Sequence, residues 1–422
     1  MEMQNGKKQN VAVVGAGIVG VCSALWLQRE GYDVTLIDPN PPGSGASYGN
    51  AGAFSPASVV PMAMPGVLRH VPGYLLNPHG PLAIHWGYLP KLAPWLLRFI
   101  RSGRRERVDK QAAALAGLLG PVFDCLMPLA KQAEATHLIR RDGFLYVYRT
   151  EAALRGDAYG WELRRRHGIA FDILEGPEIN AFDPALSPDY HAALFVPGNG
   201  HTVDPQGLVQ HLARAVEKAG GRHFKASVED FRRDGSAIRA VVTDRGEVAC
   251  DFAVIAAGAR SARLAARLGE KIPLDTERGY HLMLKSPEAM PRVPVLEAMH
   301  KFVATPMQAG LRIAGTVEFA GLDRPPNMDR ARRLLRPARA LFPALREDYP
   351  ESEMSKWMGF RPSLPDSLPV IGRSKASPGI VYAFGHGHVG MCGGPMTGKL
   401  VAEMIAGRPT SIDIAPFSQS RF

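Results

Sequence analysis

The side chains best suited to chemistry cluster near the end of the chain, in "FGHGHVGMCGGPMTGK" from residue 384 to 399. His386, His388 and Cys392 stand close together there, and their types allow a metal site, a nucleophile with its base, or a glycine-rich loop that carries histidines. A structural zinc site needs four ligands, and the missing ones would have to come from distant parts of the chain. The four cysteines form no CxxC pair. We therefore expect no metal.

The elements around these residues are readable from the apolar pattern. "GIVYAFG" (379–385) predicts a strand and "MTGKLVAEMIAG" (396–407) predicts a helix, so the segment between them is a loop and helix start. A helix start offers free amides and partial positive charge, and its glycines let backbone approach a flat ligand. We expect Cys392 to pack behind this loop. His388 either faces a substrate or only holds the loop.

A second motif lies near the start of the chain, in "NVAVVGAGIVGVCSALWLQREGYDVTLID" (10–38). A strand, a GxGxxG turn, a helix, a second strand and a terminal acid follow each other at the spacing of a βαβ dinucleotide-binding unit. The glycines allow a tight turn, close approach to a pyrophosphate and close helix packing. The residues predicted to contact the cofactor are Gly15, Ala16, Gly17, Ile18, Val19, Gly20 and Asp38.

Two further stretches favour FAD over NAD. The loop "GSGASYGNAGAFSP" (43–56) replaces the βα unit expected next in an NAD enzyme, and its Ser47, Asn50 and Gly52 can follow an extended cofactor; a surface linker is the alternative. "FAVIAAG" reads as a buried parallel strand that ends at Gly258. Because this strand comes more than 200 residues after the first one, a second domain is inserted within the nucleotide domain.

The motifs and their order resemble a known family. "VVGAGIVG", "ASYGNAGAFSP", "VDPQGLVQHLARAVEKAGG", "VIAAGARS", "GFRPSLPDSLPVIG" and "FGHGHVGMCGGPMTGKLVAEMIAG" are similar to segments of FAD-dependent D-amino acid dehydrogenases, within the D-amino acid oxidase-like (DAO) flavoproteins. The similarity runs from about residue 10 to about residue 412. It implies FAD as the cofactor, and it adds Val228, Gly387, His388 and Gly390 to the cofactor contacts.

The same resemblance suggests how a substrate is held. Arg361 in "GFRPSLPDSLPVIG" matches the arginine that commonly binds the substrate carboxylate in this family, and a planar guanidinium suits a carboxylate. A salt bridge to Asp366 is the alternative. Tyr280 and His281 lie on a predicted strand (274–286), where they point to opposite faces. We expect Tyr280 to face the pocket, and we take Arg361, Tyr280 and His388 as the candidate catalytic residues.

The expected fold is α/β, with a Rossmann-like FAD-binding domain and an inserted α+β substrate-binding domain built on an antiparallel sheet. The FAD-binding domain is expected at 8–56, 195–270 and 356–412. The substrate-binding domain is expected at 57–194 and 271–355, and "RDGFLYVYRT" (141–150) is expected as one of its strands.

The function that the resemblance implies is oxidation of D-amino acids to 2-oxo acids and ammonia, by hydride transfer from Cα to flavin N5. A quinone or another acceptor, such as an electron-transfer protein, would then take the electrons. Oxidation of a secondary amine, a cyclic imino acid of the proline or hydroxyproline type, sarcosine or glycine is the alternative. A flavin-binding subunit without turnover and an NAD enzyme remain further alternatives.

The charge and composition of the chain indicate which partners and which cellular location to expect. The net charge is +10, and no motif of nucleic-acid-binding proteins accompanies it, so nucleic acid is not an expected partner. The polar N-terminus is not a signal peptide, and prolines break the weakly charged segment 38–91, so we expect no membrane span. The segment 82–107 combines aromatic, apolar and basic residues, which is typical both of an interfacial segment and of a covering helix. The expected location is cytoplasmic, with peripheral contact to the cytoplasmic face of the inner membrane as one option.

Overall fold

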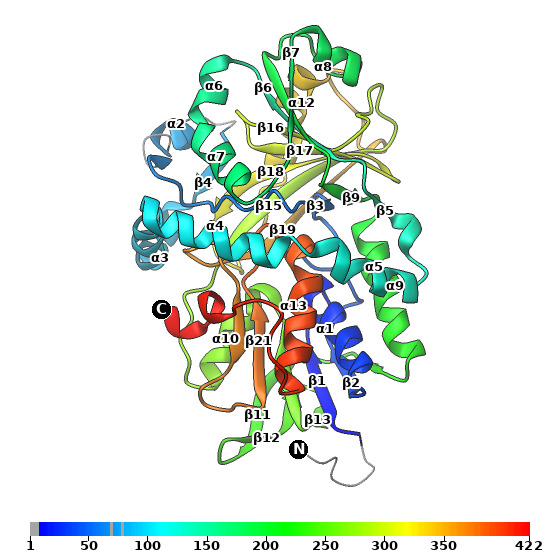
Figure 1. Ribbon diagram of the computed structural model, residues 1–422, viewed down its shortest axis with the longest axis vertical. Helices are drawn as coiled ribbons and strands as arrows, with labels where there is room; N and C mark the ends of the chain where they lie inside the picture. Colours follow the sequence, from blue (N-terminus) through cyan, green and yellow to red (C-terminus); the bar gives the residue numbers. More distant parts are fainter. Residues whose placement is uncertain (1–7, 68–70, 77–79) are drawn as a thin grey trace.

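Two large sheets, one in each half of the molecule, organise the chain in this computed structural model (Figure 1). The structure describes residues 8–67, 71–76 and 80–422. The lower sheet has six strands in the order β10 (Arg222–Phe224), β2 (Asp33–Ile37), β1 (Asn10–Val14), β14 (Phe252–Ile255), β21 (Ile380–Phe384) and β20 (Val370–Arg373). The first five are parallel, and β20 is antiparallel to β21. This confirms the nucleotide-binding architecture and its assembly from separated segments.

Both faces of this parallel sheet are covered, which explains the continuous apolar sequence of its strands. Val11 and Val13 of β1 share a core with helices on one face, whereas Ala12 and Val14 belong to a second core on the other face. The helices on the first face are α1 (Ile18–Arg29), α5 (Val122–Gln132), α9 (Pro205–Lys218) and α13 (Gly390–Ile405). The second face carries α10 (Ser261–Arg267) and a small sheet of β11 (Val228–Asp234), β12 (Ala237–Thr243) and β13 (Gly246–Ala249).

The upper sheet is larger and mostly antiparallel. Its nine strands are β19 (Met354–Ser363), β15 (Asp275–Leu284), β18 (Gly310–Phe319), β17 (Phe302–Met307), β16 (Val295–Glu297), β6 (Phe144–Tyr148), β8 (Ala192–Val196) and β7 (Asp172–Glu175), with β4 (Leu82–Ile84) beside β18. The pairs β16–β6 and β18–β4 are parallel. The strands expected at 141–150 and 274–286 are thus confirmed as β6 and β15.

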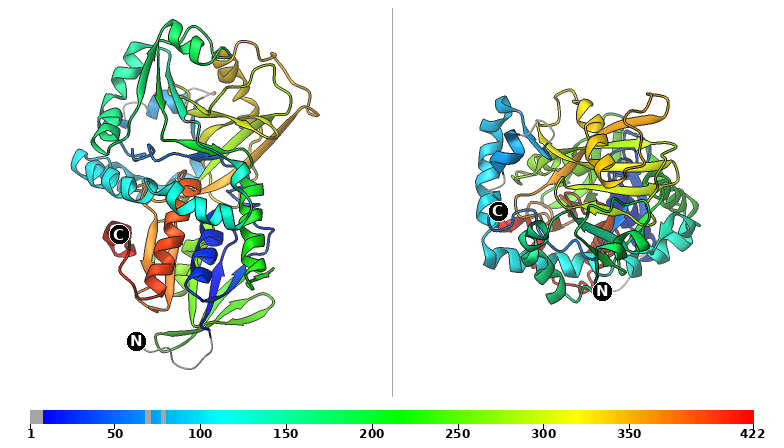
Figure 2. Two further views of the ribbon diagram at one scale, coloured as in Figure 1. Left: turned by 45° about the vertical axis from the view of Figure 1, so that its right-hand side comes forward. Right: turned by 90° about the horizontal axis from the view of Figure 1, so that it is seen from above.

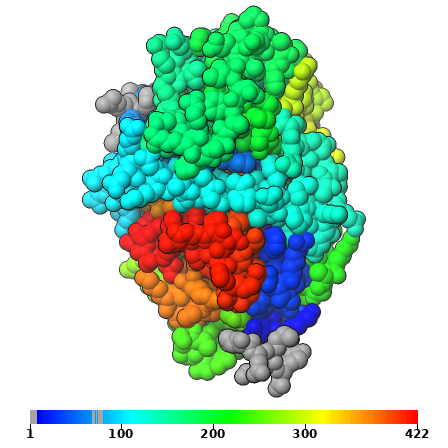
Figure 3. Space-filling view, viewed as in Figure 1, coloured from blue at the N-terminus to red at the C-terminus, as the bar shows by residue number. Residues whose placement is uncertain are grey.

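Short helices surround the upper sheet, and longer ones lie between the two halves. The short helices are α2 (Val71–Leu76), α6 (Glu151–Gly156), α7 (Ala158–Arg166), α8 (Pro177–Phe182), α11 (Asp329–Arg332) and α12 (Leu335–Leu341). Helices α3 (Leu89–Ser102), α4 (Arg105–Leu119) and α5 form a belt across the middle, which the space-filling view shows in cyan (Figure 3). A small sheet of β3 (Ala53–Phe54), β9 (Gly200–Thr202) and β5 (Ile139–Arg140) also joins the halves.

The expected domain boundaries need three corrections. Residue 356 lies inside β19, which pairs with β15 of the upper sheet, so the lower half resumes only after Ser363. Residue 195 lies inside β8, which also belongs to the upper sheet. Finally, α5 and the end of α4 lie within 57–194 but pack into the same core as α1. Sequence order alone did not reveal these pairings, because strand partners depend on register.

One helical stretch, Arg105–Gln132, is long and apolar enough to cross a membrane by length and composition. More than half of its most apolar window is buried inside the protein, as in the core helix of a folded domain. The weakly charged segment 38–91 contains no such helix among its described residues. Residues 1–7, which carry most of the evidence against a signal peptide, lie outside the described part of the chain.

Candidate functional site

The turn after β1 has the geometry that the GxGxxG motif requires. Gly15 has a φ of +108°, and a Cβ at this position would overlap the carbonyl oxygen of Ala256 on the neighbouring strand. A Cβ on Gly20 would overlap the carbonyl oxygen of Gly15. Both positions therefore demand glycine, one because of the turn and the other because α1 packs closely against it.

The surface of this turn is open to a ligand. Gly17 and Val19 are partly exposed, whereas their neighbours Ala16 and Ile18 are buried. The amides in the first turn of a helix lack intrahelical partners and point outward, which suits an anionic group. The Ile18 amide donates to the Ser47 hydroxyl at 3.2 Å, so the loop after β2 folds back onto the start of α1.

Asp38 lies at the end of β2, at the edge where the parallel strands end. Its carboxylate accepts hydrogen bonds from the backbone amides of Ala16 and Asn40, each at 2.9 Å. The side chain remains partly exposed, and an ionised carboxylate keeps further acceptor sites after two bonds. It can therefore still accept hydrogen bonds from ribose hydroxyls.

The other predicted cofactor residues lie around the same edge but play different roles. The Asn50 side chain accepts from the Gly52 amide at 2.7 Å, so it shapes the loop. Gly52 has a φ of +76°. Val228 begins β11 and packs against the core that contains Val14. Gly258 follows β14 with a φ of +56°.

Helices from near the two ends of the chain pack side by side, as Figure 2 shows for the blue α1 and the orange-red α13. A Cβ on Gly394 would lie 3.3 Å from the Ile18 side chain, and one on Gly398 would lie 2.6 Å from the backbone of Cys22. These glycines therefore serve helix packing. Helix α13 starts at Gly390, earlier than the expected residue 396.

The loop before α13 is anchored to the upper sheet. The Gly387 amide donates to the Pro362 carbonyl oxygen at 2.7 Å, and Gly387 has a φ of +52°. Gly387 and Gly390 are partly exposed, so this helix start is accessible. The loop 385–390 therefore links the upper sheet to α13, whose Gly394 packs against Ile18 at the start of α1.

His386 and Cys392 are structural. The His386 ring is buried and lies 2.8 Å from the Thr397 hydroxyl, and burial lowers its pKa to about 3. Burial raises the pKa of the Cys392 thiol to about 12, so the thiol is not an activated nucleophile. No group of three His, Cys, Asp or Glu side chains arranged for a metal exists in the part of the chain that the structure describes.

His388 and Arg361 are brought together. The His388 side chain is exposed to the open space beside it, yet desolvation, together with the nearby charge of Arg361, lowers its pKa to about 4. His388 is therefore neutral at neutral pH. The alternative of an Arg361–Asp366 salt bridge is wrong, because Asp366 pairs with Arg421 at 2.6 Å.

Arg361 is held by backbone carbonyls rather than by an acid. Its guanidinium donates to the carbonyl oxygens of Thr316 at 2.8 Å and Gly315 at 3.4 Å. Thr316 has a φ of +58°, which is strained for a β-branched residue, and it lies where the register between β15 and β18 shifts. The bulge turns the Thr316 carbonyl toward Arg361 and fixes the guanidinium without neutralising its charge.

The expectation for Tyr280 is wrong. Its hydroxyl donates to Glu318 at 2.6 Å and accepts from the Asn327 amide, so it is satisfied within the protein. Tyr280 lies on the face of β15 opposite to His281. His281 faces the lower half, with its ring 3.1 Å from the Gly49 carbonyl oxygen and stacked on Trp357 at 5.3 Å.

A small pocket, partly open to solvent, lies beside His388 and is lined by residues that the sequence did not assign to the site. Its lining includes the carboxylate of Glu277 on β15 and the stacked rings of Trp95 and Phe99 on α3. The aromatic pattern of 82–107 marked Trp95 and Phe99 only as part of an interfacial or covering segment, and no local pattern marks Glu277. The register that pairs Glu277 with Arg361 across two strands identifies Glu277 as part of the site.

These observations fit FAD. The open turn at Gly17 and Val19 and the carboxylate of Asp38 suit the pyrophosphate and ribose of a dinucleotide, and the loop with Ser47 continues from them. The start of α13 supplies amides and partial positive charge for the electron-rich end of a flavin ring.

Known proteins support this reading. A family model described as "FAD dependent oxidoreductase" (DAO) matches residues 10–404. A "D-amino-acid oxidase" of Bradyrhizobium diazoefficiens is 46% identical over 98% of this chain and 99% of that protein. A "D-amino acid dehydrogenase 2" of Ralstonia nicotianae is 34% identical over 97% of this chain and 100% of that protein. The crystal structure of glycine oxidase from Geobacillus kaustophilus has the same fold, with a TM-score of 0.73 and 23% identity over 98% of this chain and 100% of that one.

Proposed function

Because this chain belongs to the DAO family of FAD-dependent oxidoreductases, we propose that it oxidises D-amino acids to 2-oxo acids and ammonia. Two relatives of at least 34% identity over nearly the whole chain carry names with this substrate class. The structural observation that carries the proposal is Arg361, a fixed guanidinium beside neutral His388 and without a salt-bridge partner among the described residues.

The protein groups then act by binding and orientation. Arg361 binds the substrate carboxylate, and neutral His388 lies beside it without adding a second positive charge. Trp95 and Phe99 form one wall of the pocket beside His388. The chemistry that bound FAD would supply is that of an acceptor for the hydride leaving the substrate Cα. The product imine hydrolyses in water, so the site needs no nucleophilic triad.

Anaerobic bleaching of the bound flavin tests this function. The FAD-loaded protein is mixed with D-amino acids, their L enantiomers, proline, sarcosine and glycine. Bleaching by D-amino acids, and slower or no bleaching by the others, supports the proposal. Faster bleaching by the secondary amines would replace it with secondary-amine oxidation, and flavin that no compound bleaches would indicate a subunit without turnover.

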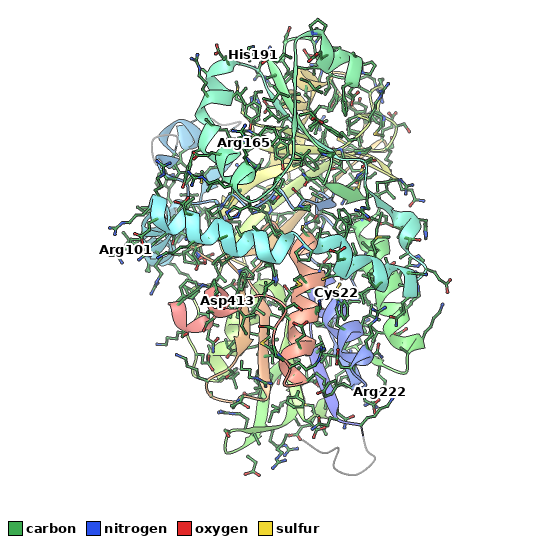
Figure 4. The ribbon with its side chains drawn as sticks, in the orientation of Figure 1. Cys22, Arg101, Arg165, His191, Arg222 and Asp413 are labelled. Atoms are coloured by element: carbon green, nitrogen blue, oxygen red, sulfur yellow. The ribbon has the colours of Figure 1, made fainter. Side chains whose placement is uncertain are left out.

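We also propose that the electrons pass to a membrane quinone at an exposed face of α3. Trp86, Leu97 and Ile100 are exposed large apolar side chains on or beside this helix, and Arg98 and Arg101 are exposed next to them; Figure 4 shows Arg101 at the outer edge of the molecule. Apolar and basic side chains together suit an anionic bilayer surface. This would place the protein in the cytoplasm, at the cytoplasmic face of the inner membrane.

Co-sedimentation with anionic vesicles at low salt tests this second proposal. We expect the protein to bind, and we expect L97S/I100S to bind at least several-fold more weakly. Ile173→Ser, which changes an exposed isoleucine far along the sequence on β7, is the matched control. Wild-type protein that stays in the supernatant, or reduction of oxygen at the same rate as of a quinone analogue, would contradict it.

A further inference from the structure

A buried carboxylate lies beside Arg361 and has no role in the function described so far. Glu277 on β15 is the cross-strand partner of Arg361 on β19, so the two side chains leave the sheet on the same face. Glu277 is only 4% exposed. Among the described residues, its carboxylate accepts one hydrogen bond, from the Ser363 hydroxyl at 2.6 Å.

The charge of Glu277 is not balanced by a nearby cation. Among the described residues, no lysine, arginine or histidine lies within salt-bridge distance of it, since the Arg361 guanidinium turns toward Thr316 and Gly315. Burial raises the pKa of Glu277, and the hydrogen bond from Ser363 and the charge of Arg361 oppose this effect only in part. His386 and His388, which share the cavity, are neutral. A buried carboxylate without a cationic partner is costly, so a bound cation would stabilise it.

The walls of the cavity are suited to a cation as well. The Trp95 and Phe99 rings are stacked at 5.3 Å with an angle of 14° between them, and both line the cavity with Glu277 and Met62. The Trp95 indole donates to the Ser363 carbonyl oxygen at 3.3 Å, which fixes its position. Aromatic faces and a carboxylate attract ammonium and guanidinium groups, whereas a purely apolar side chain would leave the carboxylate unpaired.

We propose that Glu277 binds the cationic side chain of a basic D-amino acid, such as D-lysine or D-arginine, while Arg361 holds its α-carboxylate. This inference rests on the proposed function and names the substrate class of the same site. The two protein charges lie on adjacent strands, and a basic amino acid carries complementary charges at its two ends. A neutral amino acid can still bind Arg361, but it leaves Glu277 without a counterion.

The test compares D-lysine with D-norleucine, which has a chain of similar length without the charge. Anaerobic flavin reduction by each is measured under single-turnover conditions in FAD-loaded wild type, Glu277→Gln and Glu217→Gln. We expect the wild type to favour D-lysine by at least about 10-fold. Glu277→Gln should lower the efficiency with D-lysine by about 30-fold, the effect of removing one partner of a buried charge pair. It should lower the efficiency with D-norleucine far less, so that the ratio between the two substrates falls. Glu217 is exposed on α9, and its variant should change neither.

The outcomes separate the inference from the function on which it rests. Retained activity on D-norleucine shows that the Glu277→Gln protein is folded and holds flavin. A wild-type preference for D-norleucine, or an equal loss on both substrates in Glu277→Gln, would overturn the role of Glu277 and leave D-amino acid oxidation standing. Flavin that neither compound nor any other D-amino acid reduces would refute the proposed function itself.

Discussion

The guanidinium of Arg361 lies against Gly279 on the neighbouring strand, at a place where a Cβ on Gly279 would overlap the Arg361 Cζ atom. Gly279 faces Gly359 across the β15–β19 pair, so the sheet surface under the arginine is bare backbone. This space lets the long side chain lie along the sheet and reach the carbonyl oxygens of Gly315 and Thr316. The position of the charge therefore depends on a residue that has no side chain.

Replacing Gly279 with alanine should displace the guanidinium while leaving its charge in place. A misplacement of about 1 Å at a reacting centre can cost about 100-fold in rate, so we expect kcat/KM for a D-amino acid to fall by about 10- to 100-fold. Gly156→Ala is the control, because a Cβ there meets nothing within 4 Å. Steady-state kinetics on both variants checks this, and unchanged kinetics in Gly279→Ala would show that Arg361 tolerates another position.

Arg361→Lys should keep the positive charge and lose the planar fork. Loss of one charge-assisted hydrogen bond to a carboxylate costs about 1.5–3 kcal/mol, which corresponds to a decrease in kcat/KM of about 10- to 100-fold. Arg214→Lys, an exposed change on α9, should have no effect. A decrease confined to FAD affinity, with normal kcat/KM at saturating FAD, would assign Arg361 to the cofactor instead.

Asp38→Asn should weaken FAD binding, because the neutral amide accepts hydrogen bonds less strongly than the carboxylate. We expect the Kd for FAD to rise by about 10-fold, or about 1.4 kcal/mol. Quenching of flavin fluorescence on titration with apoprotein measures this Kd. Asp172→Asn, at an exposed position of β7, should leave the Kd unchanged. An equal Kd in both variants would show that Asp38 only holds the Ala16 and Asn40 amides.

Acid should destabilise the protein through its buried neutral histidines. The folded pKa of His386 is about 3, below its usual value of 6.5, so the unfolded chain takes up a proton first as the pH falls. The contribution of neutral His386 to the free energy of unfolding is fully present above pH 6.5 and is lost as the pH falls toward 3. Over this range the free energy of unfolding falls by up to about 1.4 kcal/mol per pH unit. Urea unfolding at fixed FAD excess measures the slope. His386→Gln should make it shallower, and an unchanged slope would contradict this account.

The motifs that the sequence revealed are local ones. Gly15, Gly20 and Asp38 belong to a single βαβ unit, whose spacing is fixed by one turn and one helix, so their roles could be predicted from a short segment. Arg361 could be matched to the carboxylate-binding arginine of the family because it also lies within one short motif. Its placement in the lower half was wrong, because the strand that carries it pairs with β15, and strand partners far apart in sequence leave no local signal.

The errors and omissions have the same origin. Alternation along β15 showed that Tyr280 and His281 point to opposite faces, but which face meets the lower half depends on how the sheet packs against Gly49. Glu277 and Trp95 lie on different elements, and only the folded chain brings them to one cavity. A charged residue within a strand otherwise reads as exposed, so its burial could not be foreseen.

The central claim is that this site removes hydride from the Cα of a D-amino acid bound at Arg361. The most direct measurement is anaerobic single-turnover reduction of the bound flavin by a D-amino acid carrying either hydrogen or deuterium at Cα. The account predicts reduction that is several-fold slower with deuterium in the wild type, and far slower with either isotope in Arg361→Ala. Equal rates for the two isotopes at saturating substrate, with reduction unaffected by Arg361→Ala, would contradict it.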